Sequence, residues 1–566
     1  MHYAELMKAR DELTGPGGQF EIVHVDVNGI PLRAYKNALP NVRALWLSTA
    51  AFADRPYLVY GDERLSYAEA HAQVNATAAW LAAQGIVAGD RVAIAMRNYP
   101  EWMLIYWACV SCGIAVVGMN AWWTAEEMAY ALKDSAPKAM FLDAERLGRY
   151  REIAEPPKGI KLVGVRIPGS NDGITPWSDV IAHPGTMPDV MVDPDADACI
   201  FYTSGTTGFP KGAQLTHRGC ITNLFNMLYA GASSALATQR ATGVVPSETP
   251  APPPVALLTT PLFHVTANNC GAYATTAQGG TIVLMYRWDA GEALRIIERE
   301  RVTSIGGVPV MARELINHPD FLTTDVSSLT SMSGGGAQVP PDLVHKIEAK
   351  VASARPSTGY GMTETCGIIT SVAGDFFVDK PDSAGPAMPA YEAKCVDDDG
   401  NTVPPGQTGE LWVRGAAVIK GYINRPEATA ASITDGWLHT GDIARIDEDG
   451  FIFIVDRKKD MVLRGGENVY CAEVEATVYR HPAIAECCAF GVPDHRLGEE
   501  VGIAVLLKPG ESLTDAELRA FCGGLTASYK VPRYVWFMDE PLPRNASGKF
   551  LKRELRDRLS KDVATA

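Results

Sequence analysis

The sequence predicts an α/β protein with a large N-terminal domain of helix-covered sheets, a β-rich lobe and a smaller α+β domain at the C-terminus. Over the first 455 residues, apolar strands alternate with amphipathic helices, which is typical of parallel sheets covered by helices. From about residue 384 the pattern changes to short strands and turns, and a compact run of helix, strand and helix follows Asp456. A chain of 566 residues is also too long for one hydrophobic core, so we expect more than one domain.

Apolar runs predict the strands of the first domain. They are RVAIAM (91–96), KAMFLD (138–143), ACIFYT (198–203) and VALLTT (255–260). Residues 102–123 are uncharged, yet Pro100 indicates a helix start and Gly113 its stop. We therefore interpret this run as a buried helix followed by a strand at 114–120, and not as a membrane span. Residues 237–254 are rich in proline and predict a surface loop.

The composition limits the choice of partner and compartment. The formal net charge is -15 at pH 7, which argues against nucleic acid or an anionic membrane surface as the main partner. The 11 cysteines are scattered without zinc-site spacing, so we expect reduced, mostly buried thiols. The N-terminus lacks a secretory apolar core, which suggests the cytoplasm. The sequence leaves a homodimer open and predicts no transmembrane segment.

The stretch YTSGTTGFPKG (202–212) follows an apolar strand directly and is built to hold phosphate. Its glycines let backbone N–H groups converge on an anion, its hydroxyls add donors, and Lys211 adds positive charge. It is neither a Walker A motif, because Pro210 and Gly212 flank the lysine, nor a dinucleotide fingerprint. On the loop alone, an ordinary polar surface loop remains an alternative.

The whole string resembles the phosphate-binding signature of the adenylate-forming superfamily, which includes acyl-CoA synthetases, coumarate-CoA ligases, luciferases and adenylation domains. Seven further stretches match signatures of that family in the right order. They are PLFHVTA (261–267), GGGAQVP (334–340), GYGMTET (359–365), GELWVRG (409–415), GWLHTGD (436–442), DRKKDMVLRGGENVY (456–470) and PRNASGK (543–549). The resemblance implies two helix-covered sheets with a β-rich lobe in residues 1–455, a hinge at 456–459, and a small mobile lid domain at 460–566.

The resemblance implies an ATP-dependent, AMP-forming ligation in two steps. A carboxylate attacks the α-phosphate of ATP to give acyl-AMP, and coenzyme A then takes the acyl group. Two like charges about 4 Å apart repel by roughly 4 kcal/mol at an effective dielectric constant near 20, so the first step needs positive charge. By resemblance, Lys549 supplies this charge, Thr363 binds the α-phosphate, His264 lines the acyl site, and Glu364 is the ligand of Mg²⁺.

The remaining site residues also follow from the resemblance. Tyr360 corresponds to the residue that stacks on adenine, Asp442 and Arg457 correspond to those that bind the ribose hydroxyls, and Lys459 lies at the hinge position. Gly465 and Gly466 correspond to the wall of the pantetheine tunnel. Cys471 departs from the family pattern, because many relatives carry proline there, and this leaves the rigidity of that loop open. The other expected nucleotide-binding residues are Thr203, Ser204, Gly205, Thr206, Thr207, Gly208, Lys211, Gly335, Gly336 and Ala337.

Several functions remain as alternatives at this point. The overall pattern resembles ligases of medium- to long-chain fatty acids, with ligases of coumarate- or ferulate-type aryl acids as the second reading. Thr266 and Cys270 are small and border the acyl pocket in relatives, which favours a roomy apolar pocket. A stand-alone adenylation enzyme for a carrier protein and a luciferase-like oxygenase are weaker alternatives. A hydrolase is disfavoured because the chain has no GxSxG stretch.

Overall fold

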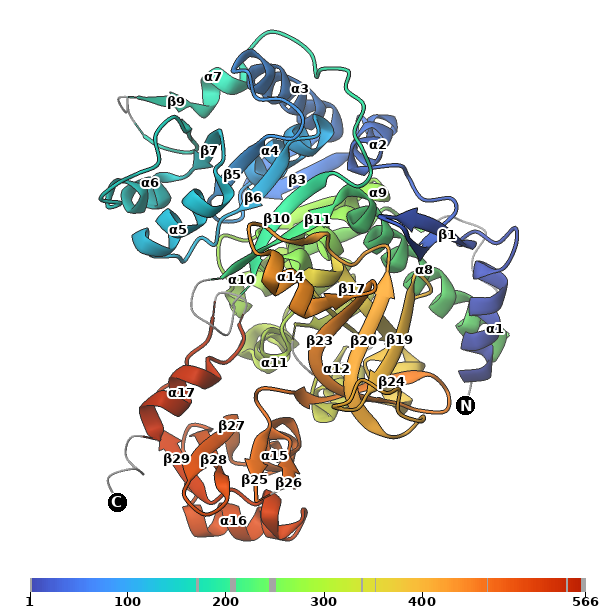
Figure 1. The fold of residues 1–566 in the computed structure, drawn as a ribbon, viewed down its shortest axis with the longest axis vertical. Coiled ribbons are helices and arrows are strands. Elements are labelled where there is room, and N and C mark those ends of the chain that lie inside the picture. Colours follow the sequence, from blue (N-terminus) through green and yellow to red (C-terminus); the bar gives the residue numbers. More distant parts are fainter. Residues whose placement is uncertain are drawn as a thin grey trace. The chain divides into compact units, whose positions relative to one another are not determined.

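The computed structural model describes residues 3–168, 173–203, 210–243, 251–336, 339–351, 353–465, 467–545 and 548–560. The chain divides into two compact units, one of residues 1–393 with 413–438 and the other of residues 394–412 with 439–566 (Figure 1). The predicted α/β class is confirmed, because two large mixed sheets with helices between their strands occupy the first unit.

The first large sheet of the first unit has eight strands. Its order is β21 (Gly421–Tyr422), β11 (Lys211–Thr216), β10 (Asp197–Thr203), β6 (Ala115–Gly118), β5 (Arg91–Ala95), β7 (Ala139–Leu142), β8 (Lys161–Gly164) and β9 (Ile174–Pro176). Strands β5 to β9 are parallel and stand in the order 2-1-3-4-5 of doubly wound folds. The apolar residues of β5, β6 and β7 are almost continuous and are buried, as parallel strands covered on both faces require.

The second large sheet also has eight strands. Its order is β17 (Gly367–Ala373), β16 (Arg355–Met362), β15 (Ser331–Gly335), β14 (Ser304–Gly307), β12 (Val255–Leu258), β13 (Thr281–Leu284), β3 (Pro56–Tyr60) and β4 (Glu63–Ser66). The inner strands from β16 to β3 are parallel, while β17 and β4 add antiparallel edges. Although β15 and β16 lie inside the sheet, their last residues are half-buried, so these strand ends are open to solvent.

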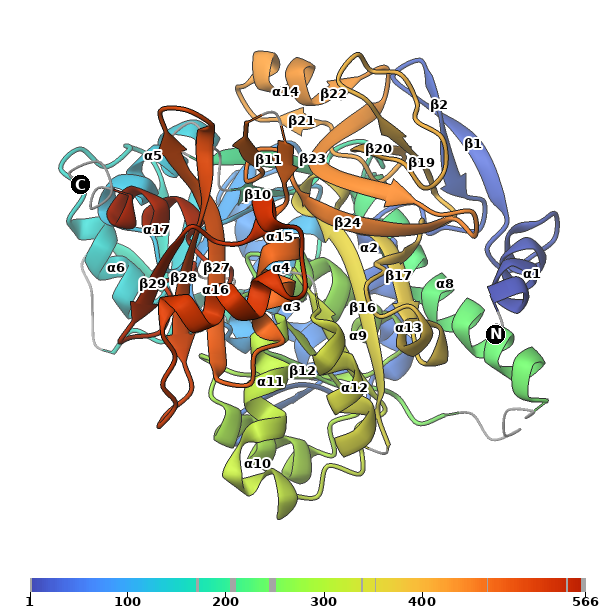
Figure 2. The same cartoon turned by 90° about the horizontal axis from the view of Figure 1, so that it is seen from below.

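Helices link these strands in the first unit. They are α1 (Tyr3–Thr14), α2 (Val42–Ser48), α3 (Tyr67–Ala83), α4 (Pro100–Ser111), α5 (Ala125–Ser135), α6 (Ala144–Arg151), α7 (Trp177–Ile181), α8 (His217–Thr242), α9 (Tyr273–Ala277), α10 (Ala290–Glu300), α11 (Pro309–Asn317), α12 (Pro341–Lys350), α13 (Asp375–Asp379) and α14 (Pro426–Ser432). Helices α10, α11 and α12 pack in sequence beside the second sheet (Figure 2). Short 3-10 turns are η1 (Thr49–Phe52), η3 (Pro319–Leu322) and η4 (Thr363–Thr365), and η2 (Thr266–Ala272) is a π-helix.

Smaller strands complete the chain, beginning with an antiparallel pair of β1 (Ile22–Val27) and β2 (Ile30–Tyr35). The β-rich lobe contains β18 (Gly385–Pro386), β19 (Tyr391–Val396), β20 (Thr408–Gly415), β22 (Ile433–Thr434), β23 (Trp437–Ile446) and β24 (Phe451–Arg457). The second unit holds a sheet of β26 (Glu467–Val469), β25 (Val462–Arg464), β28 (Gly498–Leu507), β27 (Ile484–Asp494) and β29 (Tyr534–Met538). Its helices are α15 (Cys471–Tyr479), α16 (Asp515–Gly523) and α17 (Lys552–Leu559), with a 3-10 turn η5 (Ser528–Lys530).

The uncharged run at 102–123 divides as expected into a helix and a strand. Pro100 occupies the first turn of α4, and every residue of this helix is buried. Helix α4 ends at Ser111, and β6 begins at Ala115. In the part of the chain that the structure describes, no helix combines the length and apolar character needed to cross a bilayer.

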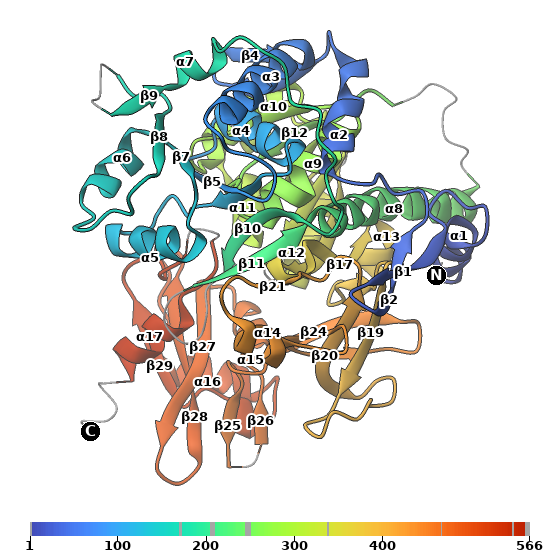
Figure 3. The same cartoon turned by 45° about the horizontal axis from the view of Figure 1, so that its top comes forward.

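The prediction of a surface loop at 237–254 is wrong for its first residues. Helix α8 continues to Thr242 and ends at Gly243, whose φ of 70° is left-handed. The N-terminal helix α1 packs along this end of α8 (Figure 3). Glu12 of α1 forms an ion pair with Arg240 of α8. Ala237 is fully buried there. Packing of α1 therefore extends α8 beyond what the local sequence indicated, while residues 244–250 lie outside the described part.

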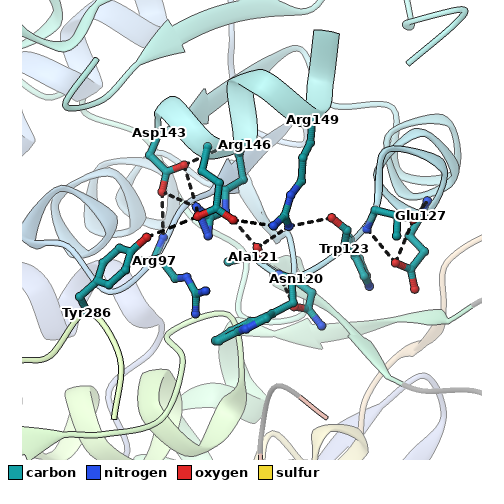
Figure 4. A network of polar contacts seen from close by, with 12 residues as sticks. Arg97, Asn120, Ala121, Trp123, Glu127, Asp143, Arg146, Arg149 and Tyr286 are labelled. Atoms are coloured by element: carbon teal, nitrogen blue, oxygen red, sulfur yellow. Dashed lines mark hydrogen bonds and ion pairs between the residues drawn. The ribbon is translucent and has the colours of Figure 1, made fainter. Parts of the chain in front are cut away.

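A polar network holds the loops at the carboxyl ends of β5, β6 and β7 (Figure 4). Asp143 caps α6 by accepting from the Arg146 amide at 3.0 Å, and it also accepts the Arg97 amide at 3.3 Å. Arg146 is fully buried, and its Nε donates to the Ala121 carbonyl at 3.0 Å. Arg149 donates to the same carbonyl at 2.8 Å. Because each buried charge has a charged or carbonyl partner, the network fixes these three loops together.

Candidate active site

The predicted phosphate loop connects two antiparallel strands. Thr203 ends β10 and lies directly opposite Lys211, which begins β11. The Lys211 ammonium lies 4.4 Å from the centre of the Tyr422 ring. The residues expected to wrap the phosphate, Ser204, Gly205, Thr206, Thr207 and Gly208, lie outside the described part of the chain. The structure thus gives the base of the loop, a hairpin with a cation held over an aromatic ring.

Glu364 lies in a turn whose backbone is fixed from several directions. It is buried, and the Tyr422 hydroxyl donates to its Oε1 at 2.8 Å. Four consecutive carbonyls of this turn accept hydrogen bonds, one from within the turn and three from distant parts of the chain. They are Thr363 (from the Cys366 amide, 3.1 Å), Glu364 (Ile419 amide, 2.9 Å), Thr365 (Tyr391 hydroxyl, 2.9 Å) and Cys366 (Asn269 amide, 3.1 Å). The carboxylate is therefore presented by a rigid backbone.

Tyr422 was not among the residues predicted from the sequence. Through its ring and its hydroxyl it contacts both Lys211 and Glu364, so it brings the base of the phosphate loop to the carboxylate. The pKa of its phenol is raised above the usual range, mainly by burial and then by the Glu364 charge, which keeps it a hydrogen-bond donor. A single tyrosine in the stretch KGYINRP has no pattern that indicates such a role.

Two of the predicted motifs lie on neighbouring parallel strands. Gly335, at the end of β15, is paired in register with Gly359 of β16, directly before Tyr360. Gly336 follows with a left-handed φ of 75°, which a side chain would strain. Tyr360 of β16 is half-buried, and its amide donates to the Thr370 hydroxyl at 3.3 Å. Thr363 follows on η4 and is half-buried, whereas Ala337 lies outside the described residues.

A cavity lies beside these motifs in the same sheet. Apolar side chains and backbone glycines form most of its wall, with two hydroxyl groups. The lining residues are Thr259, Ile305, Gly306, Gly307, Val308, Met311, Ala312, Met332 and Ser333. Its empty space is about 230 Å³, counting the part open to solvent. His264 lies in the turn between β12 and the π-helix η2 and is half-buried.

Asp442 and Arg457 are partners in the second unit. They face each other in register on β23 and β24, and Arg457 Nε lies 3.2 Å from Asp442 Oδ1. Asp442 is buried, whereas the Arg457 side chain is 45% exposed. The structure thus brings these two predicted ribose-binding residues together. The Asp442 carboxylate is oriented by a cation that itself remains accessible to a ligand.

The predicted lysines of the second unit are both exposed. Lys459 follows β24. Lys549 lies in a tight loop, in which its amide donates to Asn545 Oδ1 at 3.0 Å and its carbonyl accepts the Asn545 amide at 2.8 Å. Asn545 therefore closes the loop that carries Lys549, a role that sequence reasoning missed. Gly465 follows β25 with a left-handed φ of 60°, and Gly466 lies outside the described residues.

The hydrogen bonds of Cys471 explain why this position does not carry the proline of many relatives. Its amide donates to Asp456 Oδ2, and its thiol donates to the Asp460 carbonyl at 3.0 Å. A proline at this position would have no N–H for Asp456. The loop is therefore tied by hydrogen bonds to the segment expected to be the hinge. All 11 cysteines are free and ten are buried, which confirms the expectation of reduced, mostly buried thiols.

Asp456 makes the stability of the protein depend on pH. Burial raises the pKa of its carboxyl from 3.8 to about 6, against the opposing effect of Lys552. A raised carboxyl pKa stabilises the fold below about pH 4, and this contribution is lost as the pH rises through 6. We expect the wild type to lose about 2 kcal/mol of unfolding free energy between pH 4 and pH 7 relative to Asp456→Asn. Urea unfolding at several pH values measures this difference, and parallel curves for the two proteins would contradict it.

Comparisons with known proteins agree with these motifs. Residues 45–423 match the model of the "AMP-binding enzyme" family, and residues 473–549 match that of the "AMP-binding enzyme C-terminal domain". The chain is 37% identical over 502 residues to a feruloyl-CoA synthase of Amycolatopsis, which covers 88% of this chain and 95% of the relative. It is 35% identical to a long-chain-fatty-acid–CoA ligase of Escherichia coli, with 90% and 93% covered. Among solved structures, o-succinylbenzoate CoA synthetase of Bacillus subtilis with its acyl-adenylate is 30% identical, with a TM-score of 0.74 and coverage of 92% and 99%.

Proposed function

The chain belongs to the AMP-binding enzyme family and is an AMP-forming acid–thiol ligase, and we propose that it converts a hydrophobic carboxylic acid into its CoA thioester through acyl-AMP. Ligases of this family use ATP, Mg²⁺ and CoA. One observation carries the proposal: Tyr422 contacts both the lysine at the base of the phosphate loop and the buried Glu364. A cation and a carboxylate beside the solvent-accessible ends of β15 and β16 are what a metal–nucleotide complex requires.

The residues around Glu364 fit a magnesium ion that is shared with the nucleotide. In the described ranges, no group of three or more His, Cys, Asp or Glu side chains could hold a metal by itself. Mg²⁺ typically binds through one or two carboxylates together with substrate phosphates and waters. Glu364 would be the protein ligand, and its Oε1 is already oriented by Tyr422. When bound, the ion would supply positive charge at the phosphates.

The roles of the other residues are proposals that the family match supports. Thr363, at the start of η4, would donate to the α-phosphate, and Tyr360 would stack on adenine. Lys549 would bring its ammonium to the carboxylate and the α-phosphate, where two anions must meet. His264 would form part of the wall of the acyl site. Asp442 would accept from both ribose hydroxyls, with Arg457 beside it.

The two half-reactions call for two arrangements of the C-terminal domain. Lys549 would serve adenylation, while Gly465 and Gly466 would form a wall without side chains for pantetheine during thioester formation. We propose that residues 460–566 move about Lys459 between the steps. The exposed side chain of Lys459, two residues after the end of β24, is consistent with a hinge at 456–459. The free thiols also favour the cytoplasm as the compartment.

Two classes of acid are candidates for the substrate. Medium- to long-chain fatty acids are the first, and aryl acids of the coumarate or ferulate type are the second. The 37% identical feruloyl-CoA synthase supports the aryl class, while the 35% identical long-chain-fatty-acid–CoA ligase supports the fatty-acid class.

A pyrophosphate-release screen across fatty, aryl and branched acids tests the function and the substrate together. We expect CoA-dependent turnover with one class at least tenfold above the others, which corresponds to about 1.4 kcal/mol of selectivity. Omission of CoA should leave a single turnover of acyl-AMP formation. Sustained turnover without CoA, or release with no acid at all, would contradict a CoA ligase. Transfer only to a phosphopantetheinyl carrier protein would favour the stand-alone adenylation enzyme.

A further inference from the structure

Buried asparagines surround the turn that carries Glu364. Asn223 lies on α8, and Asn268 and Asn269 lie on the π-helix η2. All three side chains are fully buried. A buried amide costs free energy unless its donors and acceptors are paired, so its partners indicate why it is present.

Asn269 and Asn223 form hydrogen bonds with the backbone of Cys366 and Ile368, which follow Glu364 closely in the chain. Asn269 Nδ2 donates to the Cys366 carbonyl at 3.1 Å. Asn223 Oδ1 accepts the Ile368 amide at 2.9 Å, and its Nδ2 donates to the Asn269 carbonyl at 3.1 Å. The two asparagines thus form one connected unit that binds both sides of Gly367.

The backbone that they hold is strained. Cys366 has a left-handed φ of 54°, which costs a residue with a side chain free energy. Gly367 has a φ of 146°, and a Cβ there would lie 2.2 Å from Asn223 Oδ1. Such a conformation persists only where the surroundings determine it. The asparagine unit supplies that constraint from helices α8 and η2.

We propose that Asn269 and Asn223 are positioning residues that hold the Glu364 carboxylate in the orientation needed to bind the metal of the metal–nucleotide complex. This inference rests on the proposed role of Glu364 as the metal ligand. The asparagines orient the Glu364 carboxylate indirectly, because they hold the strained Cys366–Gly367 backbone. Tyr422 orients it directly through the hydrogen bond that its hydroxyl donates to Glu364 Oε1. Asn269 is buried on the π-helix η2, and short π-helical segments occur often at functional sites.

Asn269→Leu removes the amide donor at nearly constant volume and leaves the Cys366 carbonyl without this partner. Loss of outer contacts typically lowers metal affinity 10- to 100-fold. We therefore expect Mn²⁺, measured by electron paramagnetic resonance in the presence of α,β-methylene ATP, to bind 10- to 100-fold more weakly to this variant. Binding of the nucleotide without metal should change less than threefold, because the adenine and ribose contacts remain.

Asn226→Leu is the matched control. Asn226 is also a fully buried asparagine of α8, but its Oδ1 accepts from the Tyr35 hydroxyl at 2.7 Å and not from the Glu364 turn. It should lower the melting temperature in the same way while leaving Mn²⁺ affinity within threefold of wild type. Equal Mn²⁺ affinities for Asn269→Leu and Asn226→Leu would overturn the proposal.

A second measurement needs no variant. In the wild type, adding Mg²⁺ to the α,β-methylene ATP complex should slow hydrogen exchange of the Cys366 and Ile368 amides at least fivefold more than nucleotide alone. Equal protection with and without the ion would overturn the proposal even if Asn269→Leu does not fold. Glu364→Gln separates the two levels of inference. If wild type and Glu364→Gln bind Mn²⁺ equally, the proposed role of Glu364 fails. If only Glu364→Gln is impaired, the role of the asparagines alone fails.

Discussion

Replacement of Lys549 by alanine is expected to lower acyl-AMP formation by about 10²- to 10³-fold while thioester formation from supplied acyl-AMP stays within threefold of wild type. The ammonium offsets repulsion between the acid and the α-phosphate, which exists only in the first step. In the second step the acyl group is already on AMP, so this charge has no equivalent task. Pyrophosphate release measures the first step, and CoA consumption with synthetic acyl-AMP measures the second.

The loop that carries Lys549 does not depend on the lysine side chain. Its loop is closed by main-chain and side-chain hydrogen bonds with Asn545, neither of which involves the ammonium, so alanine should not disturb the loop. Arg553→Ala is the matched control, because Arg553 is a nearby cation on α17 with 72% of its side chain exposed. Both half-reactions should remain normal in that variant. An equal loss of both steps in Lys549→Ala would contradict the proposal that Lys549 serves only the formation of acyl-AMP.

The fold was predictable from the sequence where burial alone decides the structure. Strands β5, β6 and β7 are apolar on both faces because helices cover both sides, and that pattern is visible without any partner. The extension of α8 to Thr242 was not predictable, because its buried face is covered by α1, more than 200 positions earlier in the sequence. The amino-acid composition of residues 237–242 does not indicate that α1 packs against them.

The sequence motifs predicted which residues belong to the site, but not how these residues are arranged in space. Two separate motifs predicted Gly335 and Tyr360 as site residues. The structure shows that these two residues lie on the adjacent strands β15 and β16. Tyr422 and Asn269 were missed because a lone tyrosine or asparagine has no periodic pattern. Their roles depend on tertiary contacts with Glu364 and Cys366 that no spacing in the sequence expresses.

Substitution of Gly466 by tryptophan is expected to have the opposite effect from Lys549→Ala. Thioester formation should fall by about 10²-fold or more, because even a misplacement of about 1 Å at a reacting group can cost that much. Acyl-AMP formation should stay within threefold, since the glycine pair is proposed to face the nucleotide site only in the second step. Gly465 is the poorer position for this test. Its φ of 60° would strain any side chain, and a Cβ would approach Leu497 Cδ2 to 3.0 Å.

A control for a large side chain in the same domain is Gly523→Trp. Gly523 is exposed at the end of α16, and a Cβ there would meet no atom within 4 Å. Both half-reactions should therefore be normal in that variant. Normal CoA turnover by a folded Gly466→Trp protein would exclude the tunnel assignment. Loss of both steps would instead place Gly466 in contact with the nucleotide. The contrast between Lys549→Ala and Gly466→Trp thus tests whether one mobile domain serves two separate steps.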